Sequence, residues 1–84
     1  MAKVYVFTYH QAVDGEFLGI ENKVFANRED AIKAFKEWRD DDIKYCNEAG
    51  WQIGTDEEDH FEAYLLGYYA GDHSEGFVNE YDVE

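Results

Sequence analysis

One long stretch of the chain follows the 3.6-residue period of an amphipathic helix, and it limits the fold more than any other feature. Asn27 is a favourable N-cap before this stretch, two acidic residues occupy the first turn, and Gly50 suits the left-handed position that follows a helix. Asp42 is the one polar misfit among the apolar positions. The pattern predicts a helix that runs roughly from Arg28 to Ala49. Its apolar positions are Ala31, Ile32, Phe35, Trp38, Ile43, Cys46 and Ala49.

The segments before this helix read as a β-hairpin. Lys3 to His10 is rich in β-branched and aromatic residues, and Glu16 to Phe25 is a second strand-like run. The intervening segment, Gln11 to Gly15, ends in Asp-Gly, which is a strong turn signal. We therefore expect two antiparallel strands ahead of the helix.

Two further strands are predicted after the helix. His60 to Tyr69 has odd positions that are more apolar than its even ones, and Phe77 to Val83 alternates in a similar way. The acidic segment Thr55 to Asp59 and the segment Ala70 to Gly76 are predicted to be loops. The order ββαββ indicates an α+β, two-layer domain in which one helix packs on one face of a four-stranded, mostly antiparallel sheet. The expected core residues are Ile32, Phe35, Trp38, Leu65, Phe77 and Tyr81.

The composition is that of one small globular domain covering residues 1–84. An apolar fraction of 45% and an aromatic fraction of 18% are enough to build a core in 84 residues. Cys46 is the only cysteine, so no intramolecular disulfide forms, and this suits a reducing compartment. No apolar run is long enough to span a bilayer. The expected location is the cytoplasm.

Charge is unevenly distributed along the sequence. All seven Lys and Arg residues fall within residues 1–44, beside nine Asp and Glu, whereas residues 45–84 carry eleven Asp and Glu and no Lys or Arg. The acids of the second part are interleaved with aromatic and apolar residues, so we expect them on folded structure. A net charge of −13 repels nucleic acids and anionic membranes. The expected partner is therefore a protein with a basic surface.

Three segments carry a resemblance to a known group of proteins. They are the first strand (KVYV), the junction from Val24 to Ala31 (VFANREDA), and the closing strand from Phe77 to Glu84 (FVNEYDVE). With these features the chain resembles, over nearly its whole length, small and mostly uncharacterised proteins of phages and mobile elements. The resemblance implies the ββαββ architecture and a mobile-element setting, and it supplies no catalytic residues. In size and charge the chain is also similar to anti-restriction and anti-CRISPR inhibitors, some of which imitate DNA.

The sequence predicts no catalytic, metal or cofactor site. The acids of residues 56–59 lack the spacing of a calcium loop. His60 and His73 bracket the predicted third strand, which at about 3.3 Å per residue sets them roughly 30 Å apart, too far to share a metal. Cys46 lies on the apolar side of the helix with no cationic neighbour to activate its thiol. We therefore expect a protein that is not an enzyme.

The uncovered face of the sheet is the expected binding surface. If the odd residues of the last two strands face the helix, then the outward residues mix rings with carboxylates, a composition typical of interfaces. From the first strand, either Tyr5, Phe7 and Tyr9 or Val4, Val6 and Thr8 would join them. The expected outward residues are Glu62, Tyr64, Leu66, Tyr68, Val78, Glu80 and Asp82. The predicted partner-binding residues are Glu62, Tyr64, Tyr68, Glu80, Asp82 and Glu84.

Two functions are compatible with these features. The first is a protein-binding module that engages its partner, or a second copy of itself, through the open sheet face. The alternative is an inhibitor that imitates DNA and occupies a nucleic-acid-binding protein. A duplex about 30 Å long carries about 18 charges, and the chain carries a net 13.

Overall fold

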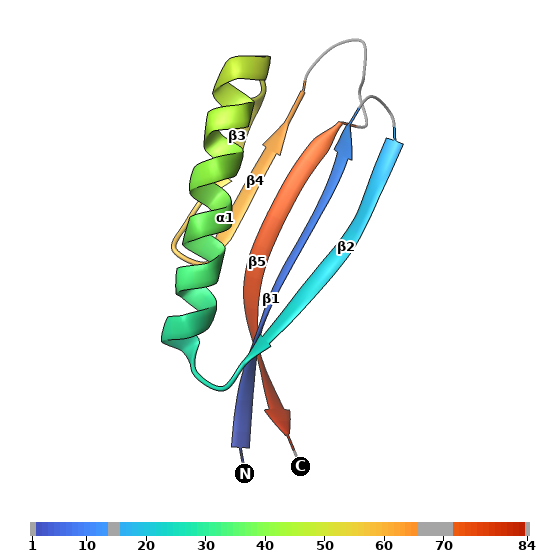
Figure 1. Cartoon of the computed structure of the whole chain (residues 1–84). Coiled ribbons are helices and arrows are strands. Elements are labelled where there is room, and N and C mark those ends of the chain that lie inside the picture. The colour runs from blue at the N-terminus through green and yellow to red at the C-terminus, as the bar shows by residue number, and fades with distance from the viewer. Residues whose placement is uncertain (1, 14–15, 66–71, 84) are drawn as a thin grey trace.

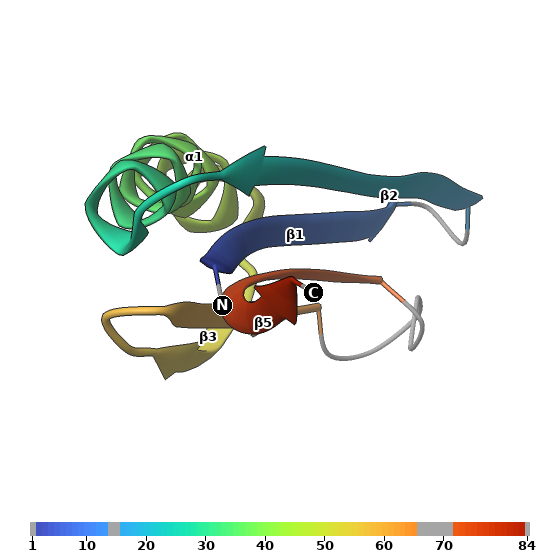
Figure 2. The same cartoon turned by 90° about the horizontal axis from the view of Figure 1, so that it is seen from below.

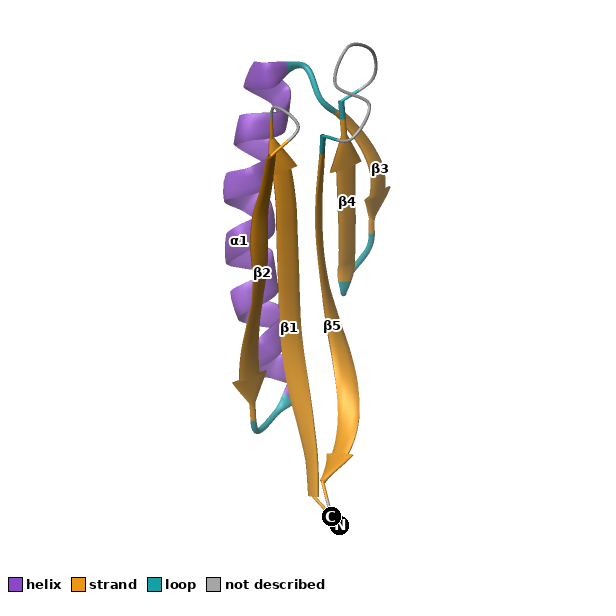
Figure 3. Ribbon diagram, turned by 90° about the vertical axis from the view of Figure 1, so that its right-hand side faces the viewer, coloured by secondary structure: helices purple, strands orange, loops and turns teal. Residues whose placement is uncertain are grey.

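The computed structural model describes residues 2–13, 16–65 and 72–83. It is an α+β domain with one helix and a five-stranded antiparallel sheet in the order β2-β1-β5-β4-β3 (Figure 1). The helix packs against one face of the sheet, and Figure 3 views the sheet from the opposite side. The elements are β1 (Ala2–Val13), β2 (Glu16–Phe25), α1 (Arg28–Ala49), β3 (Gln52–Asp56), β4 (His60–Tyr64) and β5 (His73–Val83).

The helix has the predicted bounds because both ends are fixed locally. At its start, the backbone N–H of Asp30 donates to Oδ1 of Asn27 at 2.9 Å. At its end, Gly50 adopts φ 77°, and its backbone N–H bonds to the carbonyl of Cys46. This left-handed conformation is one that glycine adopts without steric cost. The α+β class and the helix are confirmed.

The prediction of four strands is wrong, since the sheet has five. The missed strand is β3, which begins at Gln52 and takes in Thr55 and Asp56, two residues that the sequence had placed in a loop. β4 ends at Tyr64 rather than Tyr69, and β5 begins at His73 rather than Phe77. Residues 66–71, which the sequence had assigned to the third strand and the connector, lie outside the described residues.

The core lies between the helix and the sheet and is rich in aromatic rings. Phe7, Phe35 and Phe61 are fully buried, and the ring of Trp38 lies within 6.3 Å, centroid to centroid, of all three. Cys46 is fully buried, as predicted. Of the six predicted core residues, Ile32 and Phe35 are buried, and Trp38 and Leu65 pack against the core while partly exposed. The other two, Phe77 and Tyr81, do not belong to it.

Phe77 and Tyr81 were misplaced because β5 presents its smaller residues to the helix. Ser74, Gly76 and Val78 are the buried positions of this strand. A Cβ atom at Gly76 would overlap the ring of Trp38, so this ring fills the space that a side chain on β5 would otherwise take. The expectation that Val78 faces outward is therefore wrong, and Phe77 points away from the helix.

The strand register shows which residues of β1 face each side. Phe7 pairs with buried Val78, so Tyr5, Phe7 and Tyr9 lie on the helix-covered face. Val4, Val6 and Thr8 then lie on the other face, because side chains alternate along a strand. We call the side of the sheet away from α1 the open face.

The domain is long and narrow, with extents of 48, 20 and 15 Å. The first residues of β1 and the last residues of β5 pair beyond the end of the helix and carry both chain termini (Figures 1 and 3). Figure 2, viewed along this long axis, shows α1 on one side of the curved sheet. The other side of the sheet has no second layer in the part of the chain that the structure describes.

Candidate functional site

The open face carries most of the large apolar side chains that remain exposed. Among the described residues eight large apolar side chains are exposed, and five of them have the register of the open face, with exposed fractions between 43% and 66%. Half-buried Val4, Val6 and Phe77 lie between them. We call these eight residues the apolar patch: Val4, Val6, Phe17, Ile20, Val24, Phe77, Tyr81 and Val83.

Carboxylates are scarce on this same face. Along the described parts of the strands, only Glu62 and Glu75 have its register among the acidic residues. Both lie on β4 and β5, to one side of the patch, with Glu75 opposite His10, which in turn is opposite Ile20. A solvated antiparallel sheet face normally alternates polar residues outward. The open face departs from that pattern, and its composition is that of a protein interface.

The predicted binding residues are not brought together on one surface. Glu62 and Tyr64 lie half-buried on the open face, as expected. Glu80 and Asp82 are exposed but have the register of the helix side, at the ribbon that projects beyond α1. The expectation that these two share the open face is wrong, for the same reason as at Val78. Tyr68 and Glu84, like Leu66, lie outside the described residues.

All three histidines of the chain meet on the open face. Nε2 of His10 donates to Oε1 of Glu75 at 2.9 Å, and Nε2 of His60 donates to Oε2 of the same carboxylate at 2.8 Å. Nε2 of His73 lies 3.2 Å from Nδ1 of His10. We call these three histidines, Glu75 and Glu62 the histidine cluster. The ring of His10 lies near Phe17 and that of His60 near Phe77, so the cluster adjoins the apolar patch.

The carboxylate of Glu75 fixes the direction of two hydrogen bonds in this cluster. An ionised carboxylate only accepts, so His10 and His60 each donate their Nε2–H to Glu75. Nδ1 of His10 accepts from His73 when the His10 ring is neutral and donates to it when the ring is protonated. Burial raises the pKa of Glu75, but the hydrogen bonds from His60 and His10 and their charge outweigh it and lower the pKa below its usual value.

The predicted 30 Å separation of His60 and His73 is wrong. It assumed one straight strand from His60 to Tyr69, whereas β4 ends at Tyr64 and β5 returns antiparallel with His73 opposite Tyr64. Sequence reasoning therefore missed His10, His73 and Glu75. A usable signal was present, since His-x-Glu occurs twice, at residues 60–62 and 73–75. In a strand this spacing puts both side chains on one face.

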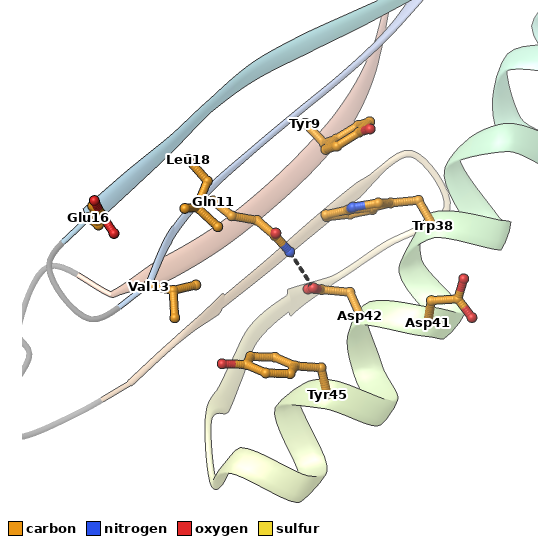
Figure 4. Close-up of a pocket in the computed structure, with 9 residues that line it drawn as sticks. All are labelled: Tyr9, Gln11, Val13, Glu16, Leu18, Trp38, Asp41, Asp42 and Tyr45. Carbon is orange, nitrogen blue, oxygen red and sulfur yellow. Dashed lines mark hydrogen bonds between the residues drawn. The ribbon is translucent and has the colours of Figure 1, made fainter.

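A hollow of about 590 Å³ lies on the helix side, between α1 and the β1–β2 hairpin (Figure 4). At its floor, Asp42 is buried and accepts a hydrogen bond from Nε2 of Gln11 at 2.7 Å. Cys46 donates its Sγ–H to the other oxygen at 3.8 Å. The lining residues are Tyr9, Gln11, Val13, Glu16, Leu18, Trp38, Asp41, Asp42 and Tyr45.

The titratable groups of this hollow do not form a nucleophile and base. Burial raises the pKa of Asp42, although hydrogen bonds from Ser74, Cys46 and Gln11 oppose it. Burial and the neighbouring charge of Asp42 raise the pKa of Cys46 to about 12, so its thiol stays protonated at neutral pH. Asp42 was the polar misfit of the helix pattern, and it is held by three partners rather than exposed.

The acids of the second half of the chain partly pair with the bases of the first half. Arg28 lies 3.5 Å from Glu58 and 3.6 Å from Asp59, and Arg39 lies 3.6 Å from Asp56. Lys3 donates to Glu80 at 3.2 Å. These are exposed or half-exposed pairs that contribute little stability each. They do show that the acidic residues of the second half of the sequence do not form a purely acidic surface in the folded protein.

No protein-family model, curated protein or solved structure matches the chain in comparisons with known proteins. Within the described residues, α1 is too polar to cross a membrane.

Proposed function

We propose that the protein is a non-enzymatic binding module that holds a partner protein on the open face of its sheet. The observation that supports this most directly is the apolar patch, which leaves five large side chains between 43% and 66% exposed on one continuous face. Exposed apolar area of this kind gains free energy when a partner removes it from water.

The proposed partner presents an apolar surface bordered by basic residues. The centre of the open face carries no charge on β1 or β2, while acids surround it on the β3–β4 loop, on the projecting ribbon and on the helix side of β2. Thr8 and Asn22, hydrogen-bonded to each other at 2.7 Å, add neutral polar groups to this centre. An uncharged, largely apolar centre with a charged rim is the usual anatomy of a protein interface. A net charge of −13 attracts a basic rim and repels a second copy of the same chain.

The DNA-mimic alternative has weaker support. The domain is 48 Å long, and a duplex of that length carries about 28 phosphate charges, whereas the chain carries a net 13. Several acids of the second half are also paired with Lys3, Arg28 and Arg39. A mimic would need a higher and less compensated charge density.

A matched pair of substitutions tests the proposal. Ile20 and Leu18 lie two residues apart on β2 with exposed fractions of 58% and 60%. They occupy different faces because the register with β1 shifts between Gln11 and Ala12, so that Ile20 is on the open face and Leu18 lines the hollow on the helix side. Ile20→Lys and Leu18→Lys therefore make the same chemical change at equal exposure. Tagged wild type and both variants are used to capture proteins from a lysate of the source cells, and the captured proteins are compared quantitatively.

We expect at least one protein that wild type and Leu18→Lys retain and Ile20→Lys loses by at least about tenfold, since a buried unpaired charge is costly at an interface. Loss with Leu18→Lys and retention with Ile20→Lys would overturn the proposal. Sedimentation analysis of the purified protein is the companion measurement. We expect a monomer at low and physiological salt, and a stable dimer that Ile20→Lys dissociates would replace the partner protein with a second copy.

A further inference from the structure

Two carboxylates face each other directly across the open face. Glu62 of β4 pairs with Glu75 of β5 in the strand register, and both are only partly exposed. Like charges in this position repel and destabilise a sheet. The pair arises because each strand carries a His-x-Glu triplet, which puts His60 beside Glu62 and His73 beside Glu75. A cation held between the two carboxylates would remove the repulsion.

Three ligand atoms converge at this point. One nitrogen of His60 and one oxygen each from Glu62 and Glu75 all lie within 4.8 Å of one another. The nitrogen of His60 and Oε2 of Glu75 are 2.8 Å apart. Two ligands on a tetrahedral zinc ion are about 3.4 Å apart. A zinc ion between these two atoms requires them to separate by roughly half an ångström and Glu62 to turn toward them from within 4.8 Å. It also requires the Nε2 proton of His60 to be released or to move to Nδ1, because only the unprotonated nitrogen binds a metal.

The surrounding groups have the arrangement of an outer coordination shell. Oε1 of Glu75, the oxygen that points away from His60, accepts from Nε2 of His10 at 2.9 Å. His10 in turn contacts His73 at 3.2 Å. Hydrogen bonds of this kind orient ligating carboxylates in metal sites. An open hollow of about 340 Å³ is lined in part by His60 and Glu75, so water can approach these two ligands.

We propose that His60, Glu62 and Glu75 bind one divalent cation of the zinc class. An imidazole nitrogen with two carboxylates suits Zn²⁺ and its neighbours among the transition metals. Ca²⁺ takes six to eight oxygen ligands and Mg²⁺ demands octahedral oxygen coordination, so three mixed ligands favour neither. The site does not depend on the partner proposed above, and its test uses the isolated protein.

Calorimetric titration of the purified full chain with ZnCl₂ tests this proposal. We expect one zinc ion to bind each chain in a saturable way. The melting temperature should also rise with zinc concentration, because the metal binds the folded state. Glu75→Gln and Glu62→Gln each remove one ligand and one negative charge. Glu58→Gln is the matched control, since Glu58 is the nearby acid of the β3–β4 loop with an exposed side chain outside the ligand set. Circular dichroism verifies that each variant is folded.

We expect Glu75→Gln and Glu62→Gln to weaken zinc binding at least about tenfold and Glu58→Gln to leave it within twofold. Substituting Co²⁺ should give a spectrum without thiolate-to-metal bands, because Cys46 is buried on the other side of the sheet. Absence of a saturable equivalent would overturn the proposal. So would equal weakening by Glu58→Gln and Glu75→Gln, or equal affinity for Ca²⁺, because either outcome would mean diffuse attraction to an acidic surface.

Discussion

The two faces of the sheet are built from alternate residues of the same strands, yet only one of them is covered. On β1, the side chain of Phe7 lies on the helix side, where it is fully buried among aromatic rings. The side chain of its neighbour Val6 lies on the open face and stays partly exposed. Both residues are apolar. On the helix side, apolar character is explained by the core of this chain. On the open face no other segment of the described chain covers it, so its apolar character points to a surface outside the molecule.

The distribution of charge sharpens the same comparison. The helix side holds ion pairs, a buried carboxylate at Asp42 and the acids of β2, while the described strands place two carboxylates on the open face, both in the histidine cluster. An 84-residue chain with a net charge of −13 has ample acid to solvate that face. Keeping charge off it costs solubility, which is the usual mark of a surface used for association.

The largest expected effect on stability comes from truncating a buried side chain on the helix side of the sheet. Phe35 is fully buried, whereas Phe77 lies half-buried on the open face. Phe35→Ala should lower the free energy of unfolding by about 3–5 kcal/mol, a large share of what so small a domain has, and Phe77→Ala by much less. Thermal and urea unfolding followed by circular dichroism measure both. Equal losses would mean that the two faces are equally important for folding and would break the comparison.

The next effect comes from adding volume under the helix. Gly76→Ala places a Cβ against the ring of Trp38, which other rings hold on several sides. Overpacking of this kind costs about 1–3 kcal/mol. Asn79→Ala is the control on the same strand, because Asn79 is exposed and should change stability by less than about 0.5 kcal/mol. An unchanged melting temperature for Gly76→Ala would show that Trp38 is not fixed over β5.

A smaller effect is expected from the buried carboxylate of the helix side. Burial raises the pKa of Asp42 above its ordinary value of 3.8, so the folded state binds the proton more tightly than the unfolded state. Stability that depends on this group is therefore highest at acid pH and falls as pH rises through the window from the ordinary pKa to the raised one. Asp42→Asn removes the ionisation, and wild type should lose stability relative to this variant as the pH rises above the ordinary pKa of 3.8.

Urea unfolding at several pH values measures this difference, with Asp41→Asn as the exposed neighbour that controls for net charge. A gap between wild type and Asp42→Asn that is constant with pH would contradict the assignment. A gap that moves in the opposite direction would mean that the hydrogen bonds from Gln11, Cys46 and Ser74 stabilise the charged form more than burial penalises it.

Features of the fold that depend on neighbouring residues could be predicted from the sequence, whereas features that depend on distant residues could not. The approximate bounds predicted for the helix agree with the structure because Asn27 and Gly50 act on their immediate neighbours. The inward face of β5 was not predicted, because it depends on Trp38 reaching across to Gly76, thirty-eight positions away. Large rings such as Phe77 and Tyr81 are the natural choice for a core when the position of Trp38 is not known.

The candidate site was predictable only in outline. An open face with rings followed from the single helix, since one helix covers one side of a sheet. The histidine cluster required the register of β4 with β5 and of β5 with β1, which no local pattern encodes. Glu80 and Asp82 were assigned to the open face on the assumption that Phe77 and the other odd residues of the last strand face the helix. Because that assumption was wrong, both assignments were wrong.

The most direct test of the central claim places a photo-reactive benzophenone amino acid at Ile20 or at Leu18 in the source cells. The two sites share a strand and nearly equal exposure and differ in the face they occupy. If the open face is the binding surface, light should cross-link the Ile20 protein to a partner in good yield and the Leu18 protein at background. Cross-linking from Leu18 and none from Ile20 would contradict the account and move the interface to the helix side.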